Sequence, residues 1–307
     1  MYFPYLRGKQ NELEALRDVN AGVYTNTRPI VEPVTLGAAR LLNYQSLAQQ
    51  DIPFILITNP YHPVSGPVGD ASIQSLITTQ LSSSTALTLG FLIDRRINMA
   101  NLNSFINSNP NRDKVLIFRY SPLPNNIISG IQSIANQASY LVFDEDKTDL
   151  NLRNSFNTHP NRVLLTDGFQ REDANALYAP VSTFQSLFQT YQNSGWAGIG
   201  DYLTIGDHFK EGGGQAMVVT LHITKETPNG IVTHHFSSTS NSSSRGLAGL
   251  KFSEANSALV NSPNTVTLAS SGLALYRHWD NISHFPGLGL PKKASIMHHI
   301  ELMSSLV

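Results

Sequence analysis

Eight short apolar runs, rich in β-branched residues, recur along this 307-residue chain with helix-compatible segments between them. The runs cover residues 28–34, 53–60, 86–94, 114–121, 139–146, 162–169, 198–205 and 216–224. Most are continuous rather than alternating, which is typical of strands buried on both faces of a parallel sheet. The segments 125–138 and 180–195 carry apolar residues at steps of three and four, which predicts helices. The pattern predicts an α/β fold, and eight strands favour a closed (β/α)8 barrel of the TIM type over an open doubly wound sheet.

The position of these runs predicts the domain organisation. We expect one barrel-like domain over the whole chain, divided into an N-terminal arm and helix (1–27), the barrel strands (28–224), and a hairpin with a C-terminal extension (225–307). Two alternating strands around the turn residues 228–230 predict the hairpin. The chain is expected to end in an apolar helix that packs on the barrel.

The first ten residues, MYFPYLRGKQ, place aromatic side chains before charged ones. A secretory leader has the opposite order, with basic residues first and an apolar run after them. We therefore expect a short strand or arm whose aromatic residues, within 2–5, are buried. Their burial would present Arg7 and Lys9 at a defined place, which suits an anionic ligand or an acidic partner surface. The alternative is a structural ion pair with Glu32 or a neighbouring acid.

Almost every predicted strand ends in an ionisable or amide side chain, and in a (β/α)8 barrel these ends share the rim where active sites lie. The candidate catalytic residues are Glu32, Asp144, Asp167 and Asp201. The candidate ligand-binding residues are Arg7, Lys9, Asn59, Arg119 and His222. Carboxylates around one mouth can bind Mg²⁺ or act as a general acid and base, and an arginine can hold an anion. The alternative is that these acids cap the following helices.

Few motifs point to a particular cofactor. The chain has no cysteine, which excludes disulfides, thiolate metal sites and cysteine nucleophiles. Neither GxGxxG nor GxSxG occurs. The glycine-rich stretch 211–215 favours a plain loop over a phosphate cradle. A zinc site built from His222 and the pairs 234–235 and 298–299 is an alternative to ordinary hydrogen-bonded histidines, and only one residue of a strand pair can face it.

Net charge and hydropathy limit the partners. Lys+Arg 21 against Asp+Glu 22 gives a net charge of −1, without the basic excess of a general nucleic-acid-binding protein. No stretch approaches the roughly 20 apolar residues of a membrane span. We expect a cytoplasmic protein. The low charged fraction of 14% slightly favours surfaces that a partner covers.

The opening and several later stretches resemble an uncharacterised bacterial and phage family called the beta-protein family. Its members open with a Tyr-x-Pro-x-Leu-(Arg/Lys)-x-Lys-Gln-x-Glu pattern followed by a Pro-Ile-(Ile/Val)-Glu strand, and here "MYFPYLRGKQNELEAL" and "RPIVEPV" match it. "FILITNP", "IGDYL" and the closing "KKASIMHHIELM" are also similar, so the resemblance covers nearly the whole chain. It implies a barrel, in some members encoded beside a small protein similar to PD-(D/E)xK nucleases, in mobile or defence-like settings. It implies no reaction and no catalytic residues.

Two functions are therefore expected as alternatives. The first is a barrel protein of a mobile or phage-defence-like system that binds and regulates a nuclease-like partner and keeps a polar site for a small anionic ligand at its mouth. The second is a metal-dependent enzyme, a Mg²⁺-assisted hydrolase or phosphodiesterase, that acts on a phosphorylated or nucleotide-like substrate. The ring of acids at the strand ends favours the enzyme, whereas the low charge and the polar loops favour the binding role.

Overall fold

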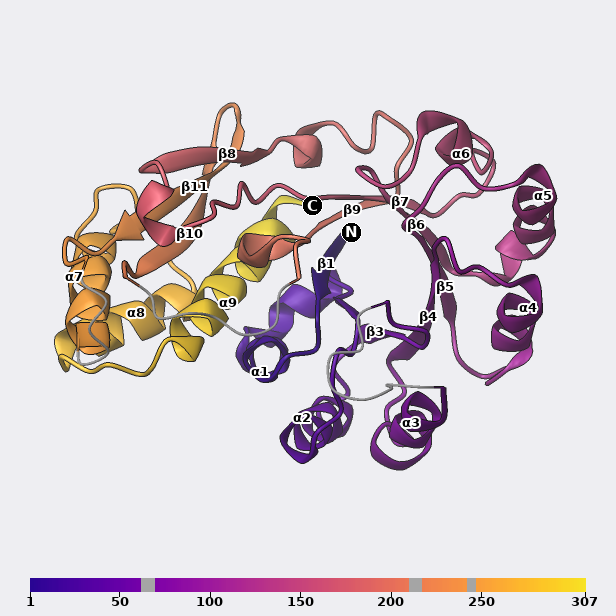
Figure 1. Cartoon of the computed structure of the whole chain (residues 1–307), viewed down its shortest axis with the longest axis horizontal. Coiled ribbons are helices and arrows are strands. Elements are labelled where there is room, and N and C mark those ends of the chain that lie inside the picture. The colour runs from indigo at the N-terminus through magenta and orange to yellow at the C-terminus, as the bar shows by residue number, and fades with distance from the viewer. Residues whose placement is uncertain (62–69, 210–216, 242–246) are drawn as a thin grey trace.

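The computed structural model describes residues 1–61, 70–209, 217–241 and 247–307. Eight parallel strands close into a barrel in the order β1-β2-β3-β4-β5-β6-β7-β9 (Figure 1). Their bounds are Tyr2–Leu6 (β1), Ile30–Val31 (β2), Phe54–Ile57 (β3), Leu87–Ile93 (β4), Lys114–Phe118 (β5), Tyr140–Asp144 (β6), Arg162–Thr166 (β7) and Gly198–Asp201 (β9). The prediction of a TIM-type barrel is confirmed. The glycine-rich stretch 211–215 and most of the polar loop around 238–246 lie outside the described residues.

The expected N-terminal arm is the first barrel strand. Tyr2, Phe3 and Pro4 pair with β9, and Tyr5 and Leu6 pair with β2, so β1 closes the ring. All five residues are buried, as expected for its aromatic side chains. The barrel strands therefore run from residue 2 to residue 201, and the predicted boundaries of 28 and 224 are wrong.

The eighth predicted barrel strand belongs to another sheet. Residues 216–224 contribute to β10 (Thr220–Thr227), which pairs antiparallel with β11 (Gly230–Ser237), and β8 (Val181–Gln185) completes the order β10-β11-β8. The hairpin of β10 and β11 is the one predicted around residues 228–230. In β10 only the alternate residues Leu221 and Ile223 join the apolar cluster under this sheet, as expected for an antiparallel strand that is apolar on one face. The segment 180–195 is not the predicted helix, since it forms β8 and a short 3-10 turn.

Helices cover the outside of the barrel (Figure 1). They are α1 (Gln10–Asp18), α2 (Ala38–Gln49), α3 (Asp70–Ser75) with its π-helical continuation η2 (Leu76–Gln80), α4 (Met99–Asn107), α5 (Asn125–Ile134) and α6 (Leu150–Asn154). Short 3-10 turns are η1 (Ala21–Thr25), η3 (Ala135–Gln137), η4 (Asn175–Leu177), η5 (Leu187–Gln189) and η6 (Leu203–Ile205). Within the described part of the chain, no helix is both long and apolar enough to cross a bilayer.

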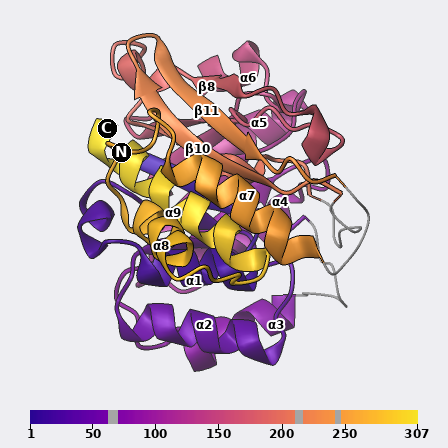
Figure 2. The same ribbon diagram turned by 90° about the vertical axis from the view of Figure 1, so that its left-hand side faces the viewer.

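The C-terminal helices join the small sheet to the barrel. They are α7 (Ala248–Val260), α8 (Ser271–Asn281) and α9 (Gly289–Leu306). In Figure 1, α8 lies between α7 and α9, and it contacts both of them. Figure 2 shows these three helices from the side, and α9 also contacts α1 and β10. The C-terminal extension is therefore packed against the barrel through α9.

Two adjacent histidines of α9 fasten this helix to both sheets. His299 Nε2 lies 3.2 Å from both carboxylate oxygens of Asp201 at the end of β9, and its Nδ1 lies 2.8 Å from the hydroxyl of Thr224 in β10. His298 Nε2 lies 2.7 Å from the carbonyl oxygen of the same Thr224. Both imidazoles are buried, so the small sheet and the barrel share hydrogen bonds in an apolar interior.

The His298 contact predicts a loss of stability in mild acid. Burial, partly offset by the bond to the Thr224 carbonyl, lowers the pKa of His298 from 6.5 to about 4. Between about pH 4 and pH 6.5, His298 is therefore protonated in the unfolded chain but neutral in the folded one. The stability that depends on neutral His298 is present above about pH 6.5 and is lost as the pH falls toward 4, by at most about 1.4 kcal/mol per pH unit.

Urea unfolding of the protein and of His298→Gln at pH 7, 6 and 5 measures this effect. We expect the variant to have the shallower dependence of the free energy of unfolding on pH, whatever its absolute stability. The exposed His278 of α8 supplies the control His278→Gln, which should keep the full slope. Equal slopes for His298→Gln and the unsubstituted protein would contradict the prediction.

Candidate functional site

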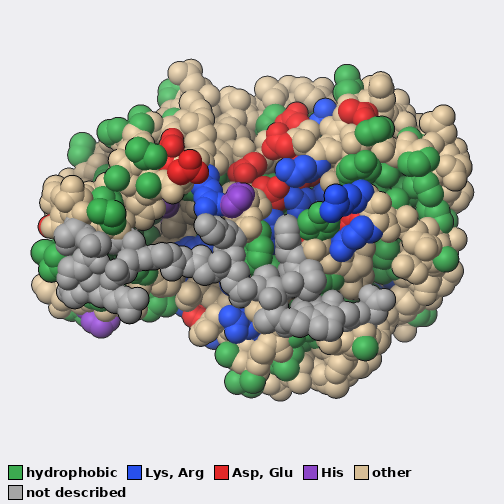
Figure 3. All heavy atoms as spheres, in the orientation of Figure 1, with side chains coloured by type: hydrophobic (Ala, Val, Ile, Leu, Met, Phe, Trp, Pro, Cys, Tyr) green, Lys and Arg blue, Asp and Glu red, His purple; other side chains and the backbone are tan. Residues whose placement is uncertain are grey.

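Charged side chains from several strand ends meet at the mouth of the barrel. Arg7 follows β1, Glu32 follows β2, Arg119 follows β5, and Asp144 is the last residue of β6. Parallel strands direct their carboxyl ends to one rim, so residues far apart in sequence become neighbours there. Figure 3 shows Lys, Arg, Asp and Glu gathered in the middle of this face. The structure thus brings together four of the predicted site residues.

Arg7 and Glu32 form a buried ion pair at this mouth. The Arg7 Nη1 contacts Glu32 Oε2, and the two side chains are 4% and 0% exposed. Glu32 also accepts hydrogen bonds from the Tyr5 hydroxyl at 2.8 Å and from the Tyr61 backbone amide at 2.6 Å. Burial raises the pKa of Glu32, but the positive charges of Arg7 and Arg119 outweigh it, and the net pKa is below its usual value. Glu32 is therefore held as a carboxylate, and the predicted Arg7–Glu32 ion pair is present.

Arg119 and Asp144 form the second pair. The Arg119 Nε donates to Asp144 Oδ2 at 3.0 Å, and the Tyr202 hydroxyl donates to the same oxygen at 2.6 Å. Burial raises the pKa of Asp144, and here the favourable contacts with Arg119 and Tyr202 do not compensate. Asp144 is thus a buried carboxyl that takes up a proton more readily than an ordinary aspartate.

Asp207, which the sequence analysis did not single out, lies at the centre of the cluster. Its carboxylate pairs with Arg7 Nη2 at 2.7 Å, with Arg119 Nη2, and with Lys147 Nζ at 3.1 Å. Burial raises the pKa of Asp207, but Arg119, Arg7 and Lys147 lower it below the usual value overall. This residue belongs to the loop after η6 and not to a strand end, so its position depends on the path of the loop, which no local pattern predicts.

Two tyrosine rings form the floor beneath the arginines. The Tyr5 and Tyr202 rings lie 5.0 Å apart. The Arg7 guanidinium carbon is 5.0 Å from the Tyr5 ring centre, and that of Arg119 is 5.5 Å from the Tyr202 ring centre. Cation–π contact of this kind orients a guanidinium without using its N–H donors. The donors therefore remain directed at carboxylates around the mouth.

Asp167 acts on the site through the loop that carries Asp207. Its Oδ2 accepts the backbone N–H of Asp207 at 2.8 Å, and its Oδ1 accepts that of Phe169 at 3.1 Å. Burial raises the pKa of Asp167. It therefore positions Asp207 and touches none of the three cations directly.

Asp201 does not join the cluster. Its carboxylate accepts hydrogen bonds from the Tyr2 hydroxyl at 2.7 Å and from the Leu203 backbone amide at 2.9 Å, and it faces His299 of α9. The next residue, Tyr202, packs inside the barrel, and successive strand residues point to opposite faces. The expected convergence of Asp201 with the other acids is therefore wrong, because its side chain points out of the barrel.

The three other predicted ligand-binding residues have local partners. The Asn59 amide exchanges two hydrogen bonds with the backbone of Leu92, at 2.9 and 2.7 Å. The Lys9 ammonium lies 4.6 Å from the centre of the Phe209 ring, beside the cluster. His222 lies in β10, away from the barrel strands, and its Nδ1 is 2.8 Å from that of His235.

The donor set does not fit a zinc ion or a preformed Mg²⁺ cage. The Nδ1 atoms of His222 and His235 contact each other at 2.8 Å. Across the described ranges of the chain, no three His, Cys, Asp or Glu side chains are grouped as metal ligands. The carboxylates of Glu32, Asp144 and Asp207 all face arginines, whereas Mg²⁺ requires carboxylate oxygens turned toward one another. The arrangement favours an anion.

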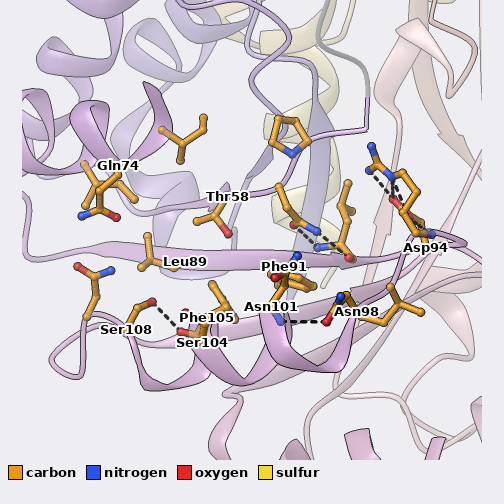
Figure 4. Close-up of a pocket in the computed structure, with 18 residues that line it drawn as sticks. Thr58, Gln74, Leu89, Phe91, Asp94, Asn98, Asn101, Ser104, Phe105 and Ser108 are labelled. Carbon is orange, nitrogen blue, oxygen red and sulfur yellow. Dashed lines mark hydrogen bonds and ion pairs between the residues drawn. The ribbon is translucent and has the colours of Figure 1, made fainter. Parts of the chain in front are cut away.

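A cavity of about 300 Å³ opens beside the charged cluster. Its lining includes Arg119, Lys147 and Asp207 with the rings of Tyr61 and Tyr120. A larger groove of about 460 Å³ lies outside the barrel over β4, between α3 and α4. In Figure 4, Asp94 stands at one end of that groove, apart from Gln74 and Ser108, and it is already paired with Arg96 at 2.5 Å. Of these two cavities, the mouth cavity is the one that combines space with converging charges.

No protein-family model matches this chain, and no curated protein is similar to it in sequence. The resemblance of its opening and closing stretches to the beta-protein family therefore stays a prediction.

Because Arg7 and Glu32 form a buried ion pair, we expect the removal of one of these charges to lower the stability of the protein strongly. We expect Glu32→Gln to lower the free energy of unfolding by about 3 kcal/mol, since Arg7 then keeps only Asp207 as a counter-ion in a buried place. The matched control is Glu145→Gln, because the side chain of Glu145 is 41% exposed and its pair with Arg153 is at 3.7 Å. This control should change stability by less than about 1 kcal/mol. Chemical denaturation of both variants at pH 7 makes the comparison, and equal losses would contradict a stabilising buried pair.

Proposed function

We propose that this protein binds a small phosphate-bearing ligand at the mouth of its barrel, through Arg7, Arg119 and Lys147. One observation carries the proposal: these three cations, from the ends of β1 and β5 and the loop after β6, converge on a single carboxylate, that of Asp207. Guanidinium groups match the geometry of phosphate and carboxylate oxygens. The Asp207 carboxylate therefore stands where the anionic group of a ligand would bind.

The protein's own carboxylate would compete with such a ligand. Asp207 lies in a loop, and 16% of its side chain is exposed, whereas the side chain of Lys147 is 43% exposed. An incoming phosphate reaches Lys147 first and then replaces Asp207 between the two arginines. The ligand gains those contacts but must displace a charged group that already satisfies them.

The biological setting comes from the resemblance to the beta-protein family. In a mobile or phage-defence-like system, occupancy of the mouth would regulate a PD-(D/E)xK nuclease-like partner. The mouth suits this role because a ligand that displaces Asp207, a partly exposed loop residue, can thereby alter the surface that a partner contacts.

An enzyme is the second candidate, and one observation favours it. The pKa values of the four carboxyl groups around the mouth differ in direction. Burial raises the pKa of Asp144 and Asp167. Neighbouring cations outweigh burial at Glu32 and Asp207 and lower the pKa of both. Such a separation is typical of sites with one general acid and one general base. Asp144 is then the acid of a hydrolase or phosphodiesterase, and Mg²⁺ would enter together with substrate phosphates, as it does in many phosphoryl-transfer sites.

Binding of inorganic phosphate tests the primary proposal. We expect Lys147→Gln to weaken phosphate binding by about threefold to tenfold, the effect of one charge-assisted contact. Arg119→Gln should weaken it more strongly, and its stability is checked by thermal unfolding. Arg17→Gln on the outer end of α1, where Arg17 pairs only with its neighbour Asp18 among the described acids, is the control for lost charge. Titration calorimetry gives the affinities; no binding to the unsubstituted protein, or equal weakening by Arg17→Gln, would overturn the proposal.

Replacing Asp207, the acid that competes with phosphate, is expected to strengthen phosphate binding. Asp207→Asn removes the charge that competes with phosphate and keeps the size of the side chain. We expect phosphate to bind about tenfold more tightly, which corresponds to about 1.4 kcal/mol, while the thermal stability of the ligand-free protein falls because Arg7 and Arg119 lose a partner. Weaker binding by Asp207→Asn would mean that this carboxylate takes part in ligand binding and does not oppose it.

A further inference from the structure

A second cationic cavity adjoins the mouth on the far side of Asp207. Its volume is about 160 Å³, and its lining includes Arg7, Lys9, Arg171, His208 and Lys292. These residues come from the end of β1, the loop after β7, the loop after η6 and the start of α9. Four permanent cations meet there although the whole chain has a net charge of −1. The concentration of charge is therefore local to this cavity.

Few acids balance these cations. Glu12 is the only carboxylate among the described lining residues. It is buried, accepts the Arg7 backbone amide at 2.7 Å, and pairs with Lys292 at 3.3 Å. No carboxylate of the described residues pairs with Arg171, whose side chain is exposed. Arg7 is paired with Glu32 and Asp207, and Lys292 is paired with Glu12. Arg171 is therefore the cation of this cavity whose charge an anionic group would neutralise.

The two cavities meet at residues 206 and 207, at the start of the loop after η6. Gly206 lines the second cavity, and the next residue, Asp207, lines the mouth cavity. Arg7 lines the second cavity and pairs with Asp207, which Arg119 and Lys147 contact from the mouth. A chain of linked anionic groups that displaces the Asp207 carboxylate would therefore pass from the mouth cavity to the second one.

The mouth cavity also offers an aromatic and apolar wall. The rings of Tyr61 and Tyr120 and the side chain of Leu92 line it beside Arg119. Tyr120 is 38% exposed, which is high for a large ring. Aromatic rings of this kind stack with flat ligand groups such as nucleobases, and a volume of about 300 Å³ is at the lower end of small-molecule sites.

From these features we infer that the ligand is a nucleoside polyphosphate, an inference that rests on the proposed phosphate site and specifies its ligand. The base lies against Tyr61 and Tyr120, the first phosphate takes the position of the Asp207 carboxylate, and the following phosphates enter the second cavity between Arg171 and Lys292. A single nucleic-acid strand is a different ligand with related chemistry, and the test below distinguishes it.

Calorimetric titrations with AMP, ATP and tripolyphosphate in EDTA test this inference. We expect ATP to bind at least tenfold more tightly than AMP. The double variant Arg171→Gln/Lys292→Gln should bind AMP unchanged and ATP only about as tightly as AMP. The Lys292 side chain is 40% exposed and Arg171 is exposed, so the variant is expected to fold. The double variant Arg17→Gln/Lys225→Gln removes the same charge elsewhere and should retain the preference for ATP.

A second variant tests the base. Tyr120→Ala should weaken AMP and ATP by the same factor, about threefold to tenfold, and leave tripolyphosphate unchanged. ATP binding no tighter than AMP would overturn the inference while leaving the phosphate site intact, whereas failure of every phosphate probe, inorganic phosphate included, would overturn both. Tighter binding of an oligothymidylate than of ATP, also lost in Arg171→Gln/Lys292→Gln, would assign the cavities to a nucleic-acid strand instead.

Discussion

The closure of the barrel by β1 is the constraint on which the rest of the structure depends. Tyr2–Leu6 pairs with β9 on one side and with β2 on the other. Its side chains point to both faces of the sheet: Tyr5 points inward beneath the arginines, and Tyr2 points outward to Asp201. Because the strand ends at Leu6, Arg7 reaches Glu32 across the rim. The same five residues thus close the sheet, fill its interior and place the first cation of the site.

The buried Arg7 and Arg119 require a neighbouring anion in the folded protein, both with and without a ligand. Moving a guanidinium from water into the protein interior costs far more free energy than moving a neutral group. This cost is offset only when the guanidinium is paired with a carboxylate or an anionic ligand. Glu32 pairs closely with Arg7 and, at 3.9 Å, with Arg119. Asp144 pairs with Arg119. Both acids are held at fixed strand ends, whereas Asp207 pairs with both arginines from a loop. The loop residue is therefore the counter-ion that a ligand can replace without unpairing Arg7 or Arg119 from the barrel. In the proposed function, this difference between fixed and loop-borne acids is what would allow an anionic ligand to enter the site.

Much of this arrangement is predictable from sequence by the alternation of strand residues. Seven of the eight predicted runs contribute barrel strands, and within them Ile30, Ile117 and Val142 face the interior. Two residues further on, Glu32, Arg119 and Asp144 must face the same way, and they meet. The same count places Asp201 outside, next to the inward Tyr202, so its exclusion was also predictable. The position of Asp207 was not, because it depends on the path of a loop between distant elements. β1 was predicted as a short strand or arm but not as a barrel strand, because a proline and leading aromatic residues obscure its strand pattern.

The C-terminal extension is part of the site's construction. Lys292 stands in the first turns of α9, and His298 and His299 further along the same helix bond to Thr224 of the small sheet and Asp201 of the barrel. A helix fixed at these buried points holds its N-terminal end against the loop that carries Asp207. Asp201 therefore contributes to the mouth without facing it, since the carboxylate that anchors α9 also fixes where Lys292 lies. The second cavity lies where the residues after β1 and the start of α9, which are far apart in sequence, come together. The ion pairs Lys292–Glu12 and Lys293–Asp18 hold α9 against α1 beside it.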